Sequence, residues 1–123
     1  MPPLIHILED DHSIREVVMY ILEDAGYEVQ ASGSVEEFKK TLGNIKPALV
    51  LVDIRLPDGD GREVCRAIKA SDNHKSIPVI LMSAHAEAKK AVEETKADDF
   101  IPKPFDITEF LHTIEKKIPK HLG

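Results

Sequence analysis

Charged and hydroxyl side chains stand at four places in the sequence where an apolar run ends. They are Glu9-Asp10-Asp11 after LIHIL, Asp53 after ALVLV, Ser83 after IPVILM and Lys103 after FIP. An unbroken run such as ALVLV is typical of a strand buried on both faces of a parallel sheet. Open α/β sheets bind ligands at the carboxyl ends of their strands. If the four runs belong to one sheet, their polar residues therefore share one edge.

Carboxylates, a lysine and a hydroxyl gathered at one edge suit phosphoryl chemistry. Two like charges about 4 Å apart repel by roughly 4 kcal/mol at an effective dielectric of 20, so neighbouring carboxylates need counter-charges. Lys103 would supply one, and a divalent cation with oxygen ligands, Mg²⁺ or alternatively Mn²⁺, would supply the rest. Asp53, ionised at neutral pH, could then attack phosphorus while Lys103 neutralises the phosphoryl oxygens and Ser83 hydrogen-bonds one of them.

Each of these residues also has an ordinary structural explanation. Asp53 could simply open the turn PDGDG, Lys103 could be a solvated loop residue, and Ser83 could be a turn serine. Chance rarely places complementary polar residues at four strand ends. Their joint occurrence favours the functional interpretation.

The segments that position these residues alternate between strand and helix patterns. Strands are predicted at 4–8, 27–31, 48–53, 77–82 and 100–101, and helices at 14–25, 35–42, 62–70, 84–96 and 107–118. Such alternation implies right-handed crossovers and a parallel sheet with helices on both faces. We predict a flavodoxin-like (βα)5 three-layer sandwich with strand order 2-1-3-4-5 and a switch point between the first and third strands.

Apolar spacing predicts which side of each helix is buried. Val17 belongs to the predicted inward stripe of the first helix, and Ile107 to that of the last. The 84–96 helix has only alanines and one valine on its stripe, so we expect it to be the least firmly docked. Asp11, Ser34 and Asp106 are predicted to cap the helices that follow them.

The composition is that of a globular domain without a nucleic-acid or membrane partner. The chain has 123 residues, of which 42% are hydrophobic, and a net charge of −6, so we expect no direct binding to nucleic acid or to an anionic membrane. The single cysteine, Cys65, suits a packed residue in a reducing compartment, and no segment has the pattern of a signal peptide or a membrane span. We expect one cytoplasmic domain over residues 1–123, structured from about 3 to about 119.

Taken together, these motifs resemble the receiver domain of response regulators in two-component signalling. The resemblance extends from ILEDD through LVDIRLPDGDG and LMSA to ADDFIPKPF, which is nearly the whole chain. It implies that Asp53 is the phosphoacceptor, with Lys103 and Ser83 as its catalytic partners. It also implies that Ser83 and Phe100 form the switch, although Phe100 could be only a core aromatic. The implied metal ligands are Glu9, Asp10, Asp53 and the backbone carbonyl of Arg55.

The resemblance also implies a signalling cycle rather than multiple-turnover catalysis on a small substrate. A sensor histidine kinase or a histidine phosphotransfer protein would phosphorylate Asp53, and Ser83 and Phe100 would rearrange in response. The face formed by the fourth helix, fifth strand and fifth helix would then pass the change to an effector domain or protein. Homodimerisation through that face is a further hypothesis that the sequence does not support.

A few positions differ from, or add to, the usual family pattern. Lys96 stands where the family often has glycine, so a left-handed helix end would have to carry a side chain. Arg55 and His85 lie two residues beyond Asp53 and Ser83, and we expect them to tune the lifetime of the phosphoryl group. The Lys103–Pro104 bond is expected to be cis by resemblance.

Three other classes of protein share parts of this pattern. A haloacid-dehalogenase-type phosphatase needs a second aspartate where this chain has Arg55. A flavodoxin-type FMN carrier needs a phosphate-binding first loop, whereas Glu9-Asp10-Asp11 would repel a phosphate. A pseudo-receiver that does not signal is disfavoured, because every residue expected at the site is present.

Overall fold

The computed structural model describes residues 2–83 and 87–118, which alternate between strands and helices. The elements are β1 (Leu4–Leu8), α1 (His12–Asp24), β2 (Glu28–Ser32), α2 (Val35–Leu42), β3 (Leu49–Asp53), β4 (Arg55–Leu56), β5 (Gly59–Asp60), α3 (Gly61–Ala70), β6 (Val79–Ser83), α4 (Glu87–Thr95), β7 (Asp99–Pro102) and α5 (Ile107–Lys117). The predicted elements are all present, with ends displaced by a few residues. The start of the predicted 84–96 helix lies outside the described residues.

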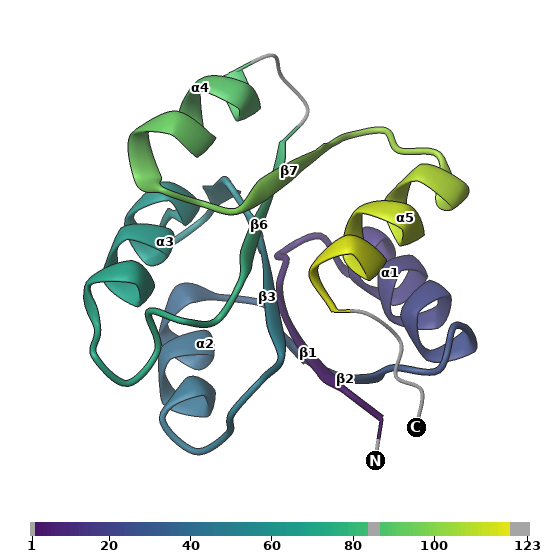
Figure 1. The fold of residues 1–123 in the computed structure, drawn as a ribbon, viewed down its shortest axis with the longest axis horizontal. Coiled ribbons are helices and arrows are strands. Elements are labelled where there is room, and N and C mark those ends of the chain that lie inside the picture. Colours follow the sequence, from purple (N-terminus) through teal and green to yellow (C-terminus); the bar gives the residue numbers. More distant parts are fainter. Residues whose placement is uncertain (1, 84–86, 119–123) are drawn as a thin grey trace.

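The main sheet is parallel and covered on both sides. Its strand order is β2-β1-β3-β6-β7, which confirms the predicted 2-1-3-4-5 order and the flavodoxin-like class. Helices α1 and α5 cover one face, and α2, α3 and α4 cover the other (Figure 1). No helix within the described residues is both long enough and apolar enough to cross a membrane.

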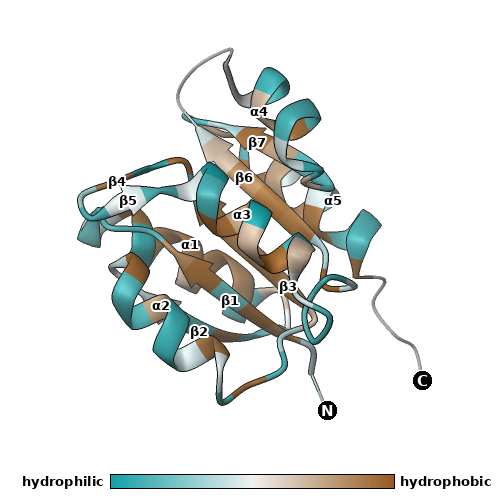
Figure 2. Cartoon of the chain, turned by 90° about the vertical axis from the view of Figure 1, so that its left-hand side faces the viewer, coloured by the Kyte–Doolittle hydropathy of each residue, from teal (hydrophilic) through white to brown (hydrophobic). Residues whose placement is uncertain are grey.

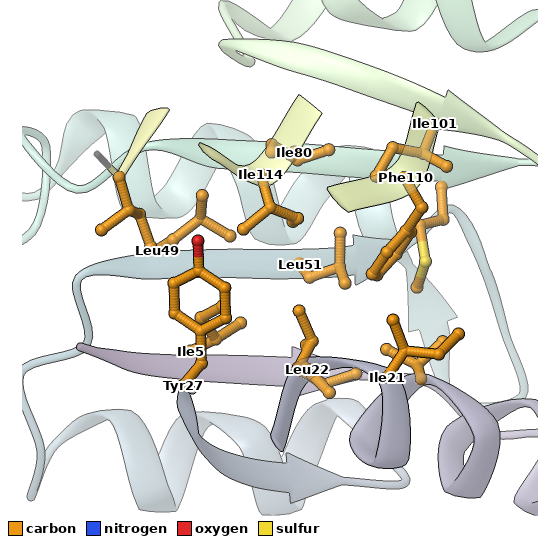
Figure 3. Packing of buried hydrophobic residues seen from close by; sticks show 14 residues of the cluster. Ile5, Ile21, Leu22, Tyr27, Leu49, Leu51, Ile80, Ile101, Phe110 and Ile114 are labelled. Atoms are coloured by element: carbon orange, nitrogen blue, oxygen red, sulfur yellow. The ribbon is translucent and has the colours of Figure 1, made fainter. Parts of the chain in front are cut away.

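Two apolar layers, one on each face of the sheet, form the core. Strand residues alternate between them: Ile5, Leu49, Leu51 and Ile80 face α1 and α5, whereas Val50, Val52, Val79 and Leu81 face α2 to α4. Figure 3 shows the first layer, in which side chains from α1 and α5 meet those of the strands. Figure 2 shows hydrophobic strands inside a shell of more hydrophilic helices. All five residues of β3 are buried, as its apolar run predicts.

Helix ends follow the predicted capping residues. The side chains of Asp11, Ser34 and Asp106 each accept a hydrogen bond from the backbone N–H three residues ahead. The Glu37 side chain reaches back to the N–H of Gly33 at 2.8 Å, one residue before the position expected in a capping box. Lys96, directly after α4, has φ +66°. A lysine therefore occupies the left-handed conformation that favours glycine.

Two residues assigned to buried stripes are exposed instead. Val17 is 52% exposed, because at 100° per residue it lies outside the stripe that Ile21 and Leu22 define on α1. Ile107 is 56% exposed. The start of α5 is covered instead by Phe105, whose ring stacks on Phe110 with 4.8 Å between ring centroids.

The turn predicted at 57–61 is a small antiparallel hairpin, β4–β5, followed directly by α3. Arg55 pairs with Asp60, and Leu56 with Gly59. Gly61, the first residue of α3, leaves no room for a side chain: a Cβ there would lie 2.1 Å from the carbonyl oxygen of Asp53. This glycine is required by the close approach of two backbone segments rather than by a positive φ.

His6 is a polar residue inside the core. Its ring is completely buried, stacks on Phe38 with 4.2 Å between ring centroids, and lies with Nε2 3.1 Å from the Ser32 Oγ. Its Nδ1 finds no hydrogen-bond partner among the residues that the structure describes. Burial lowers the pKa of the imidazole from 6.5 to about 4, although the negative charge of Glu37 opposes the change.

Acid should therefore destabilise the protein through His6. Below pH 6.5 this residue is protonated in the unfolded chain, whereas in the folded chain it is not protonated until the pH falls to about 4. Stability due to this group is present above pH 6.5 and is lost as the pH falls, by about 1.4 kcal/mol per pH unit. Urea unfolding at pH 7, 6 and 5 should show a smaller acid loss for His6→Gln than for wild type. Equal losses would contradict the assignment.

Candidate active site

The predicted polar residues of three strand ends meet at the carboxyl edge of the sheet. Strands β1 and β3 are neighbours, which brings Glu9, directly after β1, next to Asp53 at the end of β3. Lys103 enters from the segment after β7. Its side chain lies between the two acidic ones, with Nζ 2.6 Å from the Glu9 Oε1 and 2.9 Å from the Asp53 Oδ2.

Glu9 is fully buried, and three hydrogen bonds hold it in place. Its side chain accepts from Lys103 and, through Oε2, from the Asp11 N–H at 3.1 Å. Its own N–H donates to the carbonyl of Ser32 at 3.1 Å. Burial raises the pKa of Glu9 to about 7, the charge of Asp53 adds to the rise, and the Lys103 hydrogen bond opposes it. Glu9 and Asp53 thus share the single ammonium group of Lys103.

Lys103 is held at both its side chain and its backbone. Burial alone would lower the pKa of its ammonium group, but the hydrogen bonds to Glu9 and Asp53 outweigh burial, and the pKa is raised. The lysine therefore stays protonated at neutral pH. Its N–H donates to the carbonyl of Ser83 at 2.8 Å, and the peptide bond to Pro104 is cis, as the resemblance implied.

A third carboxylate completes a cluster with the donor chemistry of a cation site. Oxygen atoms of Glu9, Asp10 and Asp53 all lie within 4.8 Å of one another. Asp10 is exposed, whereas Glu9 and Asp53 are buried, so the cluster has one side open to water. An all-oxygen donor set with room for water fits Mg²⁺. Burial is the main cause of the raised pKa of Glu9, and a further positive charge beside this side chain would favour its ionised form.

The other predicted residues lie around this cluster at different depths. Ser83 ends β6 and is 2% exposed, next to β3 in the sheet. Phe100, on β7, is half-buried and packs against the apolar layer beneath α2 to α4. Arg55 is exposed, and its N–H donates to the Asp53 Oδ1 at 3.3 Å. His85 lies outside the described residues.

Arg15, on α1, was not identified from the sequence. Its guanidinium Nη1 donates to the carbonyls of Glu9 at 2.8 Å and Asp10 at 3.4 Å, so it holds the backbone of both acidic residues. The same group packs closely over Gly33, where a Cβ would lie 3.0 Å from Nη1. Its position one turn after Asp11, the cap of α1, is the only signal in the sequence, and that signal does not distinguish it from a surface arginine.

Comparison with known proteins identifies the family. Residues 5–115 match the response regulator receiver domain. This chain belongs to that family. The matched residues include the acidic cluster of Glu9, Asp10 and Asp53, and they also include Lys103.

Similar proteins support this assignment in sequence and in structure. The DNA-binding transcriptional regulator NtrC of Proteus hauseri is 37% identical over 91% of this receiver domain, which corresponds to 24% of NtrC. RpaA of Synechocystis, a DNA-binding dual master transcriptional regulator, is 32% identical over 89% of this chain and 46% of RpaA. This chain thus spans 24% and 46% of the lengths of these two relatives.

Solved structures of response regulators share the whole fold. A putative response regulator from Chloroflexus aurantiacus superposes with a TM-score of 0.92 at 27% identity, covering 98% of this chain and all of that one. The response regulator TrrA from Thermotoga maritima, solved in complex with Mg²⁺-BeF, gives a TM-score of 0.86 at 27% identity, with 96% and 100% covered.

Removing the Lys103 charge should destabilise the domain. Lys103→Met leaves Glu9 and Asp53 buried without a counter-charge, and we expect a loss of about 2 kcal/mol or more. Adding Glu9→Gln to Lys103→Met removes one of the two repelling carboxylates and should recover part of that loss. Denaturant unfolding at pH 8 without divalent cations measures both effects. A Lys103→Met protein as stable as wild type would contradict the electrostatic role.

Proposed function

We propose that this receiver domain is a phosphorylation-dependent switch in which Asp53 accepts the phosphoryl group. The single observation that carries the proposal is the arrangement of one lysine ammonium between two buried carboxylates, with a third carboxylate within 4.8 Å. A purely structural ion pair needs no third acid beside it. We also propose that the residues from about 3 to 119 act as one such domain.

Glu9, Asp10 and Asp53 are proposed to hold Mg²⁺, with the backbone carbonyl of Arg55 as a further ligand. The donor set of the cluster supports this assignment, and so does the Mg²⁺ in the TrrA complex. Mn²⁺, which prefers the same ligands, is an alternative. When bound, the metal would supply positive charge for the phosphoryl oxygens.

Residues of the chain itself would do the rest of the chemistry. A carboxylate oxygen of Asp53 forms a bond to phosphorus as the phosphorus–nitrogen bond of a phosphohistidine breaks, and the donor histidine leaves. Lys103 already contacts Asp53 at 2.9 Å, so it can follow the charge onto the transferred group. No general base is proposed, because carboxylates as a class are ionised at neutral pH.

The response would then spread along the sheet edge. The new group adds roughly −1.5 to −2 charges. Ser83 is proposed to hydrogen-bond it, and half-buried Phe100 to turn inward in response. Strand β7, which carries Phe100, contacts both α4 and α5, so the proposed output face consists of α4, β7 and α5. The change is a population shift between two arrangements rather than a new fold.

The partners follow from the family and stay proposals. A sensor histidine kinase or a histidine phosphotransfer protein would donate the phosphoryl group, and an effector domain or protein would read the output face. The relatives NtrC and RpaA are DNA-binding regulators of which this chain matches only a part. We propose that nucleic-acid binding, if it occurs in the pathway, belongs to another segment, since this chain carries a net charge of −6.

Phosphorylation at Asp53 can be tested with a small donor. Incubation with acetyl phosphate and Mg²⁺ should add the mass of one phosphoryl group to wild type, and excess chelator should abolish the addition. Asp53→Asn should not be modified, because an amide is a poor nucleophile. Intact-protein mass spectrometry measures the adduct. No adduct in wild type, or an undiminished one in Asp53→Asn, would overturn the proposal.

Arg55 and His85 are proposed to set the lifetime of the phosphoryl group by shielding or orienting the attacking water. The exposed Arg55 side chain lies two residues after Asp53 in the sequence. Arg55→Ala and His85→Ala should each change the decay rate of phospho-Asp53, with acceleration of up to about tenfold, or 1.4 kcal/mol of barrier. Arg66→Ala, at an exposed arginine paired with Glu63, is the control. Unchanged decay in both test variants would contradict this role.

A further inference from the structure

Asp58 joins the β4–β5 hairpin to the start of α2. Its Oδ1 accepts the N–H of Val35 at 2.9 Å, and its Oδ2 accepts the N–H of Glu36 at 3.2 Å. These hydrogen bonds, the Val35 one most strongly, lower the pKa of Asp58, so it is ionised at neutral pH. A carboxylate at a helix N-terminus is also favoured by the helix dipole. The contact therefore joins two segments more than twenty residues apart in sequence.

The capping of α2 is shared between its own residue and this distant one. Ser34 accepts the N–H of Glu37 at 3.2 Å, and the N–H of Phe38 donates to the Ser34 carbonyl. Asp58 accepts the two amide groups that remain in the first turn. Ser34 and Asp58 thus serve the same helix end, but only Asp58 belongs to the hairpin.

The hairpin is in turn tied to the phosphoacceptor. The N–H of Arg55, in β4, donates to the Asp53 Oδ1 at 3.3 Å. At the other end of the hairpin, the N–H of Gly61 donates to the Ile54 carbonyl at 2.8 Å. Gly59 lies against α2, where a Cβ would come within 3.0 Å of the Val35 Cγ2. One end of the hairpin orients Asp53, and its turn rests on α2.

We propose that Asp58 is a positioning residue for Asp53: by anchoring the hairpin to α2, it holds the Arg55 N–H that orients the Asp53 carboxylate. Asp58 is not a member of the cluster formed by Glu9, Asp10 and Asp53, so it acts through the backbone and not as a ligand. The expected change in Mg²⁺ affinity rests on the proposed Mg²⁺ site. The expected change at the Arg55 amide rests on the hydrogen bonds alone.

Ser34→Ala provides a matched control for Asp58→Ala. Both variants remove capping from α2 and should lower its stability, but only Asp58→Ala frees the hairpin. In ¹H–¹⁵N spectra without metal, Asp58→Ala should shift the Arg55 amide resonance, and Ser34→Ala should leave it near its wild-type position. In calorimetric Mg²⁺ titrations, Asp58→Ala should weaken binding by about tenfold, the lower end of the effect of residues that orient metal ligands. Asp58→Asn, which keeps one acceptor oxygen, should bind with intermediate affinity.

The outcomes separate this inference from the proposed function. Equal effects of Asp58→Ala and Ser34→Ala on both the Arg55 resonance and the Mg²⁺ affinity would overturn it, since Asp58 would then be only a helix cap. An Asp58→Ala protein with wild-type affinity and an unmoved Arg55 resonance would overturn it as well. Failure of the wild type to bind Mg²⁺ would contradict the proposed metal site, and the Arg55 resonance would still decide whether Asp58 positions the hairpin.

Discussion

The interaction on which the site depends is the contact of one ammonium group with two buried carboxylates. Lys103 lies 94 residues from Glu9 and 50 from Asp53 in the sequence, and these charges meet only if β1, β3 and the segment after β7 reach the same edge. Neither carboxylate would be stable in its buried position without a counter-charge. Because the cluster has three carboxylates and one lysine, its ionised form carries an excess of negative charge that a bound cation would offset.

Backbone contacts hold this charge cluster in place. Arg15 binds the carbonyls of Glu9 and Asp10, and the N–H of Lys103 binds the carbonyl of Ser83. In the β4–β5 hairpin, the N–H of Arg55 donates a hydrogen bond to the side chain of Asp53. The side chains at the site are thus oriented by groups from several elements.

Much of the fold could be predicted because hydrophobic periodicity reports burial directly. Alternating strand and helix patterns led to the correct sheet order, and the strand ends led to Glu9, Asp53 and Lys103. The misses have definite causes. Val17 lies just outside the angular width of a buried stripe, and Phe105 takes the place expected for Ile107. The β4–β5 hairpin is too short for any periodic signal to develop.

The sequence by itself determined the order of the elements, the polar residues at the strand ends and the family, because each of these depends on local pattern. Only the tertiary structure decided which polar residues form hydrogen bonds to the backbone beyond their own turn or helix. Asp58 reads as a turn residue, yet it binds a backbone N–H group 23 residues away. Arg15 reads as a surface charge, yet it binds the carbonyls of the two acidic residues that precede its own helix. The same holds for ALVLVD: the run predicts a buried strand that ends in a carboxylate, whereas the lysine that meets that carboxylate is supplied by the fold. Hydrogen bonds between segments distant in sequence have no periodicity, so they cannot be found until the chain is packed.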